Sequence, residues 1–208
     1  MQARDIMSSP VVTVTPDMTV KYAANLLSAH GFTALPVLDA DGRLIGVVTE
    51  ADLVRDRFPR DARYRPAEDT PGEDTVADVP PAGTVGGVMT TPVVGMGAGT
   101  DVVDLVRVLL EDRIRSMPIV DGAHVVGIVT RRDLVQALAR DDEVISADVR
   151  HQLAIYGGPA RWTVEVHGGA VEVVDAFDDE TDRHVATVLA QAVPGVTAVR
   201  VTGTSTAG

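Results

Sequence analysis

The sequence contains no cysteine, so disulfide bonds, thiolate metal sites and cysteine nucleophiles are all excluded. Its longest apolar runs have the length of a strand, well short of the ~20 residues that a helix needs to cross a bilayer. The N-terminus, Met1 to Met7, lacks the basic start and the apolar centre of a signal peptide. We therefore expect a cytoplasmic protein without a transmembrane helix.

Positive charge and catalytic signatures are scarce as well. Lys21 is the only lysine, and the formal net charge of the 208 residues is −12. Nucleic-acid binding gains its affinity from phosphates neutralised by Lys and Arg, so we expect no nucleic-acid partner. The chain has no nucleophile elbow, no phosphate-binding Gly-x-x-x-x-Gly-Lys, no Rossmann glycine motif and no paired histidines of the zinc-helix type. We therefore expect a protein that is not an enzyme and holds no metal.

What the chain does contain is an internal repeat. Three motifs occur twice in the same order, and their paired segments are MSSPVV and MTTPVV, ALPV and SMPI, and LIGVVTEADL and VVGIVTRRDL. The first copies begin at Met7, Ala34 and Leu44, and the second copies begin at Met89, Ser116 and Val125. Two similar units are therefore present, joined by a long connection.

The hydrophobic periods predict the order β-α-β-β-α in each copy. The first copy has a strand, a helix that starts at Pro16-Asp17 and ends at Gly31, two strands paired across an Asp-Gly turn, and a helix that opens at Thr49. Its strands are expected at Val11–Val14, Leu35–Leu38 and Leu44–Val48. The second copy has strands expected at Val93–Val94, Met117–Val120 and Val125–Val129, and helices over Val102–Leu110 and from Thr130 to about Ala139. Because three strands alone cannot bury both faces, the copies are expected to pack face to face.

Two further segments have a different character. Arg57 to Gly87 is rich in Pro, Gly and acidic residues and has no period, which predicts a linker or surface loop, with a lid over a ligand cleft as the alternative. The C-terminal part predicts a small α-β-β-α-β domain that docks on the repeat, and its acidic run Asp178–Asp182 predicts a helix start. The predicted boundaries are 1–57 and 84–140 for the copies, 58–83 for the linker, 141–203 for the C-terminal domain and 204–208 for a tail.

Each copy closes with a Thr that is followed three residues later by an Asp, as Thr49 and Asp52 and then as Thr130 and Asp133. This spacing after an apolar run predicts a capping box, in which both side chains bind free amides at the start of a helix. The same groups suit a nucleotide, because a helix N-terminus attracts anions and an acidic residue binds ribose hydroxyls. A plain helix cap is the alternative for each motif.

The duplicated unit resembles a pair of CBS domains, named from cystathionine β-synthase. The resemblance rests on the Met-x-x-Pro-Val start, the Leu-Pro-Val and Met-Pro-Ile-Val strands, and the closing Thr-x-x-Asp-Leu, which together cover about half of the chain. It implies an α+β fold in which two repeats pack as a pseudo-symmetric pair, often dimerise further, and bind adenosine-containing ligands in clefts between the repeats.

The resemblance also implies roles for particular positions. The Thr and Asp of each closing motif would contact ribose and phosphate, and backbone of the first strand would contact adenine. The implied positions are Thr49, Asp52, Thr130, Asp133, Val12, Thr13, Val94, Gly95, Leu35, Pro36, Met117 and Pro118.

The C-terminal part resembles a BON domain, a small module of bacterial envelope and osmotic-stress proteins. The resemblance rests on the segments VEVHGGAV, from Val164, and VPGV, from Val193. A second Gly that usually follows the hairpin is absent, since Val174-Asp175-Ala176 stands there. The resemblance implies association with membranes or ligands. From residue 141 onwards, eleven acidic residues stand against four arginines, which disfavours anionic lipid.

The two closing motifs differ in charge. Glu50 and Asp52 suit a helix start, whereas Arg131 and Arg132 each oppose the helix dipole by about 0.3–1 kcal/mol. A phosphate bound between these guanidinium groups and the helix amides would offset that cost. The alternative is that both side chains extend into water or pair with acidic residues, namely Asp101, Asp104 or Glu111. Secondary candidates of the same kind are Arg113 and Arg115.

We therefore expect a regulatory sensor, acting as a homodimer, whose ligand is AMP, ADP, ATP, NAD or S-adenosylmethionine. No tightly bound cofactor is expected. The competing hypothesis is a ligand-free scaffold, in which the Thr and Asp pairs are only caps and the C-terminal domain supports oligomerisation or membrane-side association.

Overall fold

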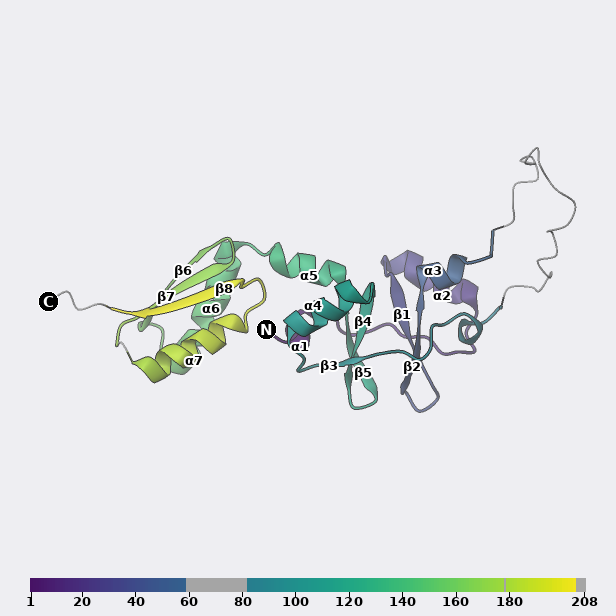
Figure 1. Ribbon diagram of the computed structural model, residues 1–208, viewed down its shortest axis with the longest axis horizontal. Helices are drawn as coiled ribbons and strands as arrows, with labels where there is room; N and C mark the ends of the chain where they lie inside the picture. Colours follow the sequence, from purple (N-terminus) through teal and green to yellow (C-terminus); the bar gives the residue numbers. More distant parts are fainter. Residues whose placement is uncertain (59–81, 178, 205–208) are drawn as a thin grey trace, which may run out of the picture. The chain divides into compact units, whose positions relative to one another are not determined.

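The computed structural model describes residues 1–58, 82–177 and 179–204 (Figure 1). The predicted linker over 58–83 therefore lies almost entirely outside the described residues, as does most of the predicted tail. The chain divides into two compact units. One comprises Val11–Val94 with Gly122–Val125, and the other comprises Met1–Pro10, Gly95–Asp121 and the chain from Val126 onwards.

The first copy contributes helices α2 (Val20–His30) and α3 (Glu50–Val54) and the antiparallel strands β1 (Ala34–Leu38) and β2 (Leu44–Thr49). The predicted hairpin and the helix end at Gly31, whose φ is 65°, are confirmed. The predicted helix start at Pro16 is three residues early, because the Thr19 hydroxyl accepts the Tyr22 N–H and fixes the start there. The predicted strand Val11–Val14 is reduced to a single bridge from Val14 to Val37.

The second copy contributes a three-stranded sheet in the order β3 (Met96–Gly97), β4 (Ser116–Asp121), β5 (His124–Thr130). Helices α4 (Val102–Glu111) and α5 (Arg131–Leu138) accompany this sheet, as predicted. The strand predicted at Val93–Val94 is wrong by three residues. Backbone pairing to β4 begins only at Met96, which lies opposite Ile119, and the Val94 side chain is 61% exposed.

The N-terminal segment of the chain completes the second copy. The short helix α1 (Ala3–Ile6) was not predicted, and its fully buried Ala3 packs in a core with Leu105 and Ile119. The Ala3 N–H donates to the Thr100 carbonyl at 2.8 Å. Four residues are too few to show a helical period, so tertiary contacts must hold this turn.

In the same way, the short 3₁₀ helix η1 (Val85–Gly87), which stands at the start of the second copy in sequence, completes the first. Val85 is fully buried in the first copy's core, and its N–H donates to the Met18 carbonyl at 2.8 Å. Each sequence copy is therefore completed by the first residues of the other copy. The repeats in the sequence and the compact units in space do not have the same boundaries.

The C-terminal part has the predicted order, namely α6 (Asp142–Gly157), β6 (Trp162–His167), β7 (Ala170–Asp175), α7 (Glu180–Gln191) and β8 (Ala198–Gly203). Strand β7 pairs antiparallel with β6 and parallel with β8. Helices α6 and α7 pack on this sheet (Figure 1). Alternate residues of β6 point into the core, beginning with Trp162 and Val164. The predicted helix start in the acidic run is confirmed, because the Asp179 carboxylate accepts the Thr181 and Asp182 N–H groups.

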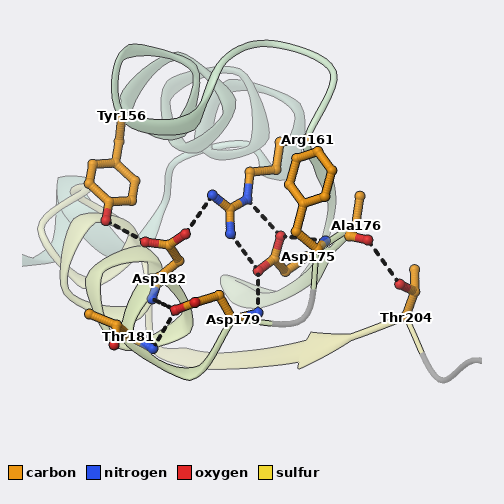
Figure 2. A network of polar contacts seen from close by, with 9 residues as sticks. Tyr156, Arg161, Asp175, Ala176, Asp179, Thr181, Asp182 and Thr204 are labelled. Carbon is orange, nitrogen blue, oxygen red and sulfur yellow. Dashed lines mark hydrogen bonds and ion pairs between the residues drawn. The ribbon is translucent and has the colours of Figure 1, made fainter.

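A buried ion pair ties the two ends of this domain's hairpin together. Arg161 donates to both carboxylate oxygens of Asp175, at 2.7 and 2.8 Å, and its third nitrogen lies 2.6 Å from Asp182, which also accepts the Tyr156 hydroxyl (Figure 2). The Asp175 side chain is fully buried. The Arg161 hydrogen bonds outweigh burial and lower the pKa of Asp175 from 3.8 to about 2. The guanidinium also lies 4.5 Å from the Trp162 ring centre, within cation–π range.

We expect Asp175→Asn to lower the free energy of unfolding of this domain by about 1.5–3 kcal/mol, because it removes the paired charge-assisted hydrogen bonds from Arg161, which keeps its contact with Asp182. Since the folded pKa of Asp175 lies below the unfolded value of 3.8, the pair stabilises the fold above pH 3.8, and this contribution is lost as the pH falls through about 2. Urea unfolding followed by Trp162 fluorescence at pH 6 and near pH 2 would measure both effects. Glu172→Gln, on the exposed face of the same strand, is the matched control. Equal stability of the two variants at pH 6 would contradict the assignment.

Candidate functional site

Both predicted capping boxes are present. In each, the Asp is the third residue of its helix, and its carboxylate turns back to the Thr at the helix start. At α5, the Thr130 N–H and hydroxyl donate to Asp133 Oδ2 at 2.7 and 2.6 Å. At α3, the Thr49 N–H and hydroxyl donate to Asp52 Oδ2 at 2.9 and 2.7 Å. The predicted caps are therefore confirmed. In each motif one carboxylate oxygen is held by the Thr, and Oδ1 remains for other partners.

The second copy gives that remaining oxygen a further partner. The Ser8 hydroxyl donates to Asp133 Oδ1 at 3.0 Å, and Ser8 is held there by backbone hydrogen bonds to Ile128 in both directions, at 2.9 and 3.1 Å. Thr90 takes the place of Ser8 beside the first copy and pairs with Val47 in the same way. Within the part of the chain that the structure describes, Asp52 receives no such second hydroxyl. The second copy therefore gathers more polar groups than the first.

Arg131 points away from the start of its own helix. Its guanidinium donates to the Leu109 carbonyl at 2.7 Å, in the last turn of α4. A cation is favoured at a helix C-terminus, so this contact offsets the unfavourable place of Arg131 at the start of α5. The partner is neither water nor one of the acidic residues considered from the sequence. Arg132 is exposed, as are Arg113 and Arg115.

The remaining candidate positions fall into two groups. Leu35 and Met117 are 1% and 0% exposed and belong to the hydrophobic cores of their copies, so only their backbone is available to a ligand. The prolines that follow them, Pro36 and Pro118, are buried too. Val12, Thr13 and Gly95 are partly buried, whereas Val94 is exposed. Val12, Thr13 and Val94 share a unit with Thr49 and Asp52, whereas Gly95 shares a unit with Thr130 and Asp133.

A groove of about 470 Å³ opens beside Asp133, along α5. Its further polar lining comes from Gln136 of α5 itself and from three other parts of the same unit, through Asp5, Arg140 and Asp148. Sequence reasoning did not identify these residues or Ser8. Ser8 could have been found, because it lies in the repeated MSSPVV motif. Gln136 lies on the same helix face as Asp133 by its spacing of three residues, whereas only the fold brings Asp5, Arg140 and Asp148 to Asp133.

In the described ranges, no group of three or more His, Cys, Asp or Glu side chains is placed to hold a metal ion. None of the described helices combines the length and the apolar character that a membrane span requires.

Comparisons with known proteins agree with the duplication. The CBS domain matches the chain twice, over residues 3–57 and 85–140, which together make up more than half of it. The protein MJ1404 of Methanocaldococcus jannaschii is 31% identical over 135 residues, which are 64% of this chain and 31% of that protein. The chain thus spans about a third of this relative.

Two solved structures have a similar fold. The CBS domain pair of protein MJ0100, in complex with 5′-methylthioadenosine and S-adenosyl-L-methionine, is 25% identical with a TM-score of 0.52, and the match covers 65% of this chain and 94% of that one. CBSX2 in complex with AMP is 27% identical with a TM-score of 0.51, over 65% of this chain and 94% of that one. With the duplicated motif, its two capping boxes and the mixed α+β fold, these matches show that the chain belongs to the CBS-domain family.

Proposed function

We propose that this chain is a regulatory module, not an enzyme, that binds an adenosyl ligand at Thr130 and Asp133. The observation that carries the proposal is the meeting of Ser8, Thr130 and Asp133 at the start of α5. Two proteins of similar fold were solved with ligands that contain an adenosyl group, MJ0100 and CBSX2. The shared chemistry of those ligands is an adenine and a ribose, whereas their phosphate content differs.

The second copy suits such a ligand better than the first. Helix α5 has eight residues and begins with two arginines, whereas α3 has five residues and begins with Glu50. A longer helix without an acidic first residue leaves a stronger positive end for a phosphate or a ribose oxygen. The Asp133 carboxylate would accept the vicinal hydroxyls of the ribose, as carboxylates do in other nucleotide sites. Arg132, which is exposed, would pair with a phosphate, and Arg131 would do so only by leaving the Leu109 carbonyl.

The proposed mechanism is a shift in population. A ligand that binds one packing of the module more tightly than another changes what the module presents to a partner, by no more than the difference in affinity. The proposed working form is a homodimer in the cytoplasm. The BON-like character of the C-terminal domain remains a prediction, supported so far by its α-β-β-α-β order.

A ligand-free scaffold is the second candidate function. It is favoured by one observation, namely that both capping boxes are complete without any ligand. In this function the Thr and Asp pairs only start helices, and the C-terminal domain supports oligomerisation or membrane-side association.

A thermal-shift panel of AMP, ADP, ATP, NAD and S-adenosylmethionine separates these functions. A ligand at 100 times its Kd should stabilise the module by about 2.7 kcal/mol, which is a shift of several degrees in Tm. Asp133→Ala should remove the shift, whereas Asp52→Ala, its match in the first copy, should keep most of it. Unchanged midpoints with all five compounds would support the scaffold, and loss of the shift only in Asp52→Ala would place the ligand in the first copy.

Within the described residues, Asp133 accepts a hydrogen bond from Ser8 that Asp52 lacks, so replacing the two residues should change the free energy of unfolding by different amounts. Asp52→Ala should cost about 0.5–2 kcal/mol, the usual value of a helix cap. Asp133→Ala should cost about 1 kcal/mol more, because it also removes the hydrogen bond from Ser8. Chemical unfolding of both variants, with Ser8→Ala and the double variant Ser8→Ala/Asp133→Ala, would measure that coupling. Additive effects of Ser8→Ala and Asp133→Ala would show that the hydrogen bond contributes nothing.

A further inference from the structure

The proposed ligand-binding pair, Thr130 and Asp133, lies at the start of α5. The C-terminal domain follows the end of the same helix. We infer that α5 is a connector, which transmits changes in the hydrogen bonds of Asp133 to the C-terminal domain. Arg140, just beyond the end of α5, makes the contacts that transmit them, and we call these contacts the latch. The regulatory use of this connector rests on the proposed function. The mechanical coupling itself does not require a ligand.

Arg140 makes two contacts with the C-terminal domain. One guanidinium nitrogen donates to the Pro194 carbonyl at 2.6 Å, and another lies 2.5 Å from the Asp148 carboxylate. Pro194 follows α7, and Asp148 lies in α6, so one side chain reaches both helical parts of that domain. The Arg140 side chain is 25% exposed and the Asp148 side chain 50%, so the ion pair lies at the edge of the junction and solvent screens part of its attraction.

The backbone at the junction is packed too closely for a side chain. Gly195 has a φ of +93°, and a Cβ atom there would lie 3.0 Å from the Ala137 carbonyl oxygen and 2.8 Å from Ile145 Cδ1. Any larger residue at this position would force α5 and the loop after α7 apart. Arg140 and Gly195 together therefore fix where the C-terminal domain meets the last turn of α5.

The apolar side of the same junction is packed less tightly. A cavity of about 120 Å³ lies between Leu138 of α5, Val196 of the C-terminal domain and Met1. Side chains that line such a space lack packing partners on that side. The specific contacts across the junction are therefore those of Arg140 and Gly195.

The latch and the proposed ligand pair line the same groove. Asp133, Arg140 and Asp148 all contribute to the groove of about 470 Å³ along α5. The part of α5 that leads from one to the other, Asp133–Leu138, is about 9 Å long at 1.5 Å per residue and is internally hydrogen-bonded, so it moves as one piece. A change in the hydrogen bonds of Asp133 therefore alters the position of Arg140 relative to Asp148 and Pro194, and the reverse holds by linkage.

Trp162 makes this coupling measurable, because it is the only tryptophan and lies buried in the C-terminal core. Its fluorescence reports on the core formed by α6, α7 and the sheet β6–β8. In the full chain without ligand, Asp133→Ala should lower the Trp162-monitored midpoint by several degrees, although Asp133 lies outside that domain. In the background of Arg140→Gln, the same change should leave this midpoint within about a degree of the Arg140→Gln value, as expected when coupled sites are uncoupled.

The control is Arg107→Gln, which removes the exposed pair with Asp104 on α4 and touches no junction residue. In this background the full effect of Asp133→Ala should persist. Equal effects of Asp133→Ala in the wild-type and Arg140→Gln backgrounds would overturn the latch. So would an unchanged Trp162 midpoint in Asp133→Ala itself. Asp148→Asn serves as a second, smaller change at the latch and should act like Arg140→Gln.

The same unfolding experiment with AMP or S-adenosylmethionine added tests the latch and the proposed function separately. Calorimetry first measures binding directly. A compound that binds should raise the Trp162 midpoint in the wild type and lose that shift in Arg140→Gln, when each protein is compared at a ligand concentration that calorimetry shows to saturate it. Binding that leaves the wild-type Trp162 midpoint unchanged would overturn the latch. If neither compound binds, the proposed function loses its support. The comparison of Asp133→Ala in the wild-type and Arg140→Gln backgrounds without ligand then decides alone whether α5 is a connector.

Discussion

The backbone pairing of Ser8 with Ile128 is the contact on which the second copy depends. It requires Gly127, because a Cβ atom at that position would overlap the Met7 side chain. With no side chain there, Met7 lies against β5 and Ser8 comes within hydrogen-bond distance of Asp133. The proposed site thus depends on a residue that has no functional group. The first copy repeats the arrangement, with a Cβ atom at Gly46 placed 2.7 Å from the Met89 sulfur.

The two copies share this framework, but the surroundings of their closing motifs differ. In the first copy, acidic residues follow Thr49, and within the described residues no second hydroxyl reaches Asp52. In the second, Ser8 adds a hydroxyl to Asp133 and Arg131 reaches back to α4. The two helix starts are equivalent in backbone, and the second has extra polar groups around it. Such local departures from simple helix rules are common at functional sites.

Much of the fold could be predicted because its signals are local. The Asp-Gly turn, the alternating apolar residues and the Thr-x-x-Asp spacing each act within a few residues, and the elements that they predict are present. The errors occur where tertiary contacts decide. The strand at Met96–Gly97 is defined by its pairing with β4, and α1 exists because Ala3 fills a core. Arg131 reaches Leu109, and Arg140 reaches Pro194, for the same reason. No periodic pattern carries that information.

The crossed placement of the N-terminal segments has a consequence for how this chain acquires its structure. Ala3 makes its backbone contact with Thr100, and Val85 with Met18, so neither compact unit is contiguous in the sequence. A fragment cut between the two sequence copies would lack a piece of its own core. The unit that contains Met1–Pro10 also needs the chain from Gly95 onwards. Its first ten residues are therefore synthesised long before the residues with which they pack. Contacts this distant along the chain slow folding, because loop closure must precede the contacts that stabilise it. The two copies therefore have to fold together, and an isolated copy should not fold into one half of the pair.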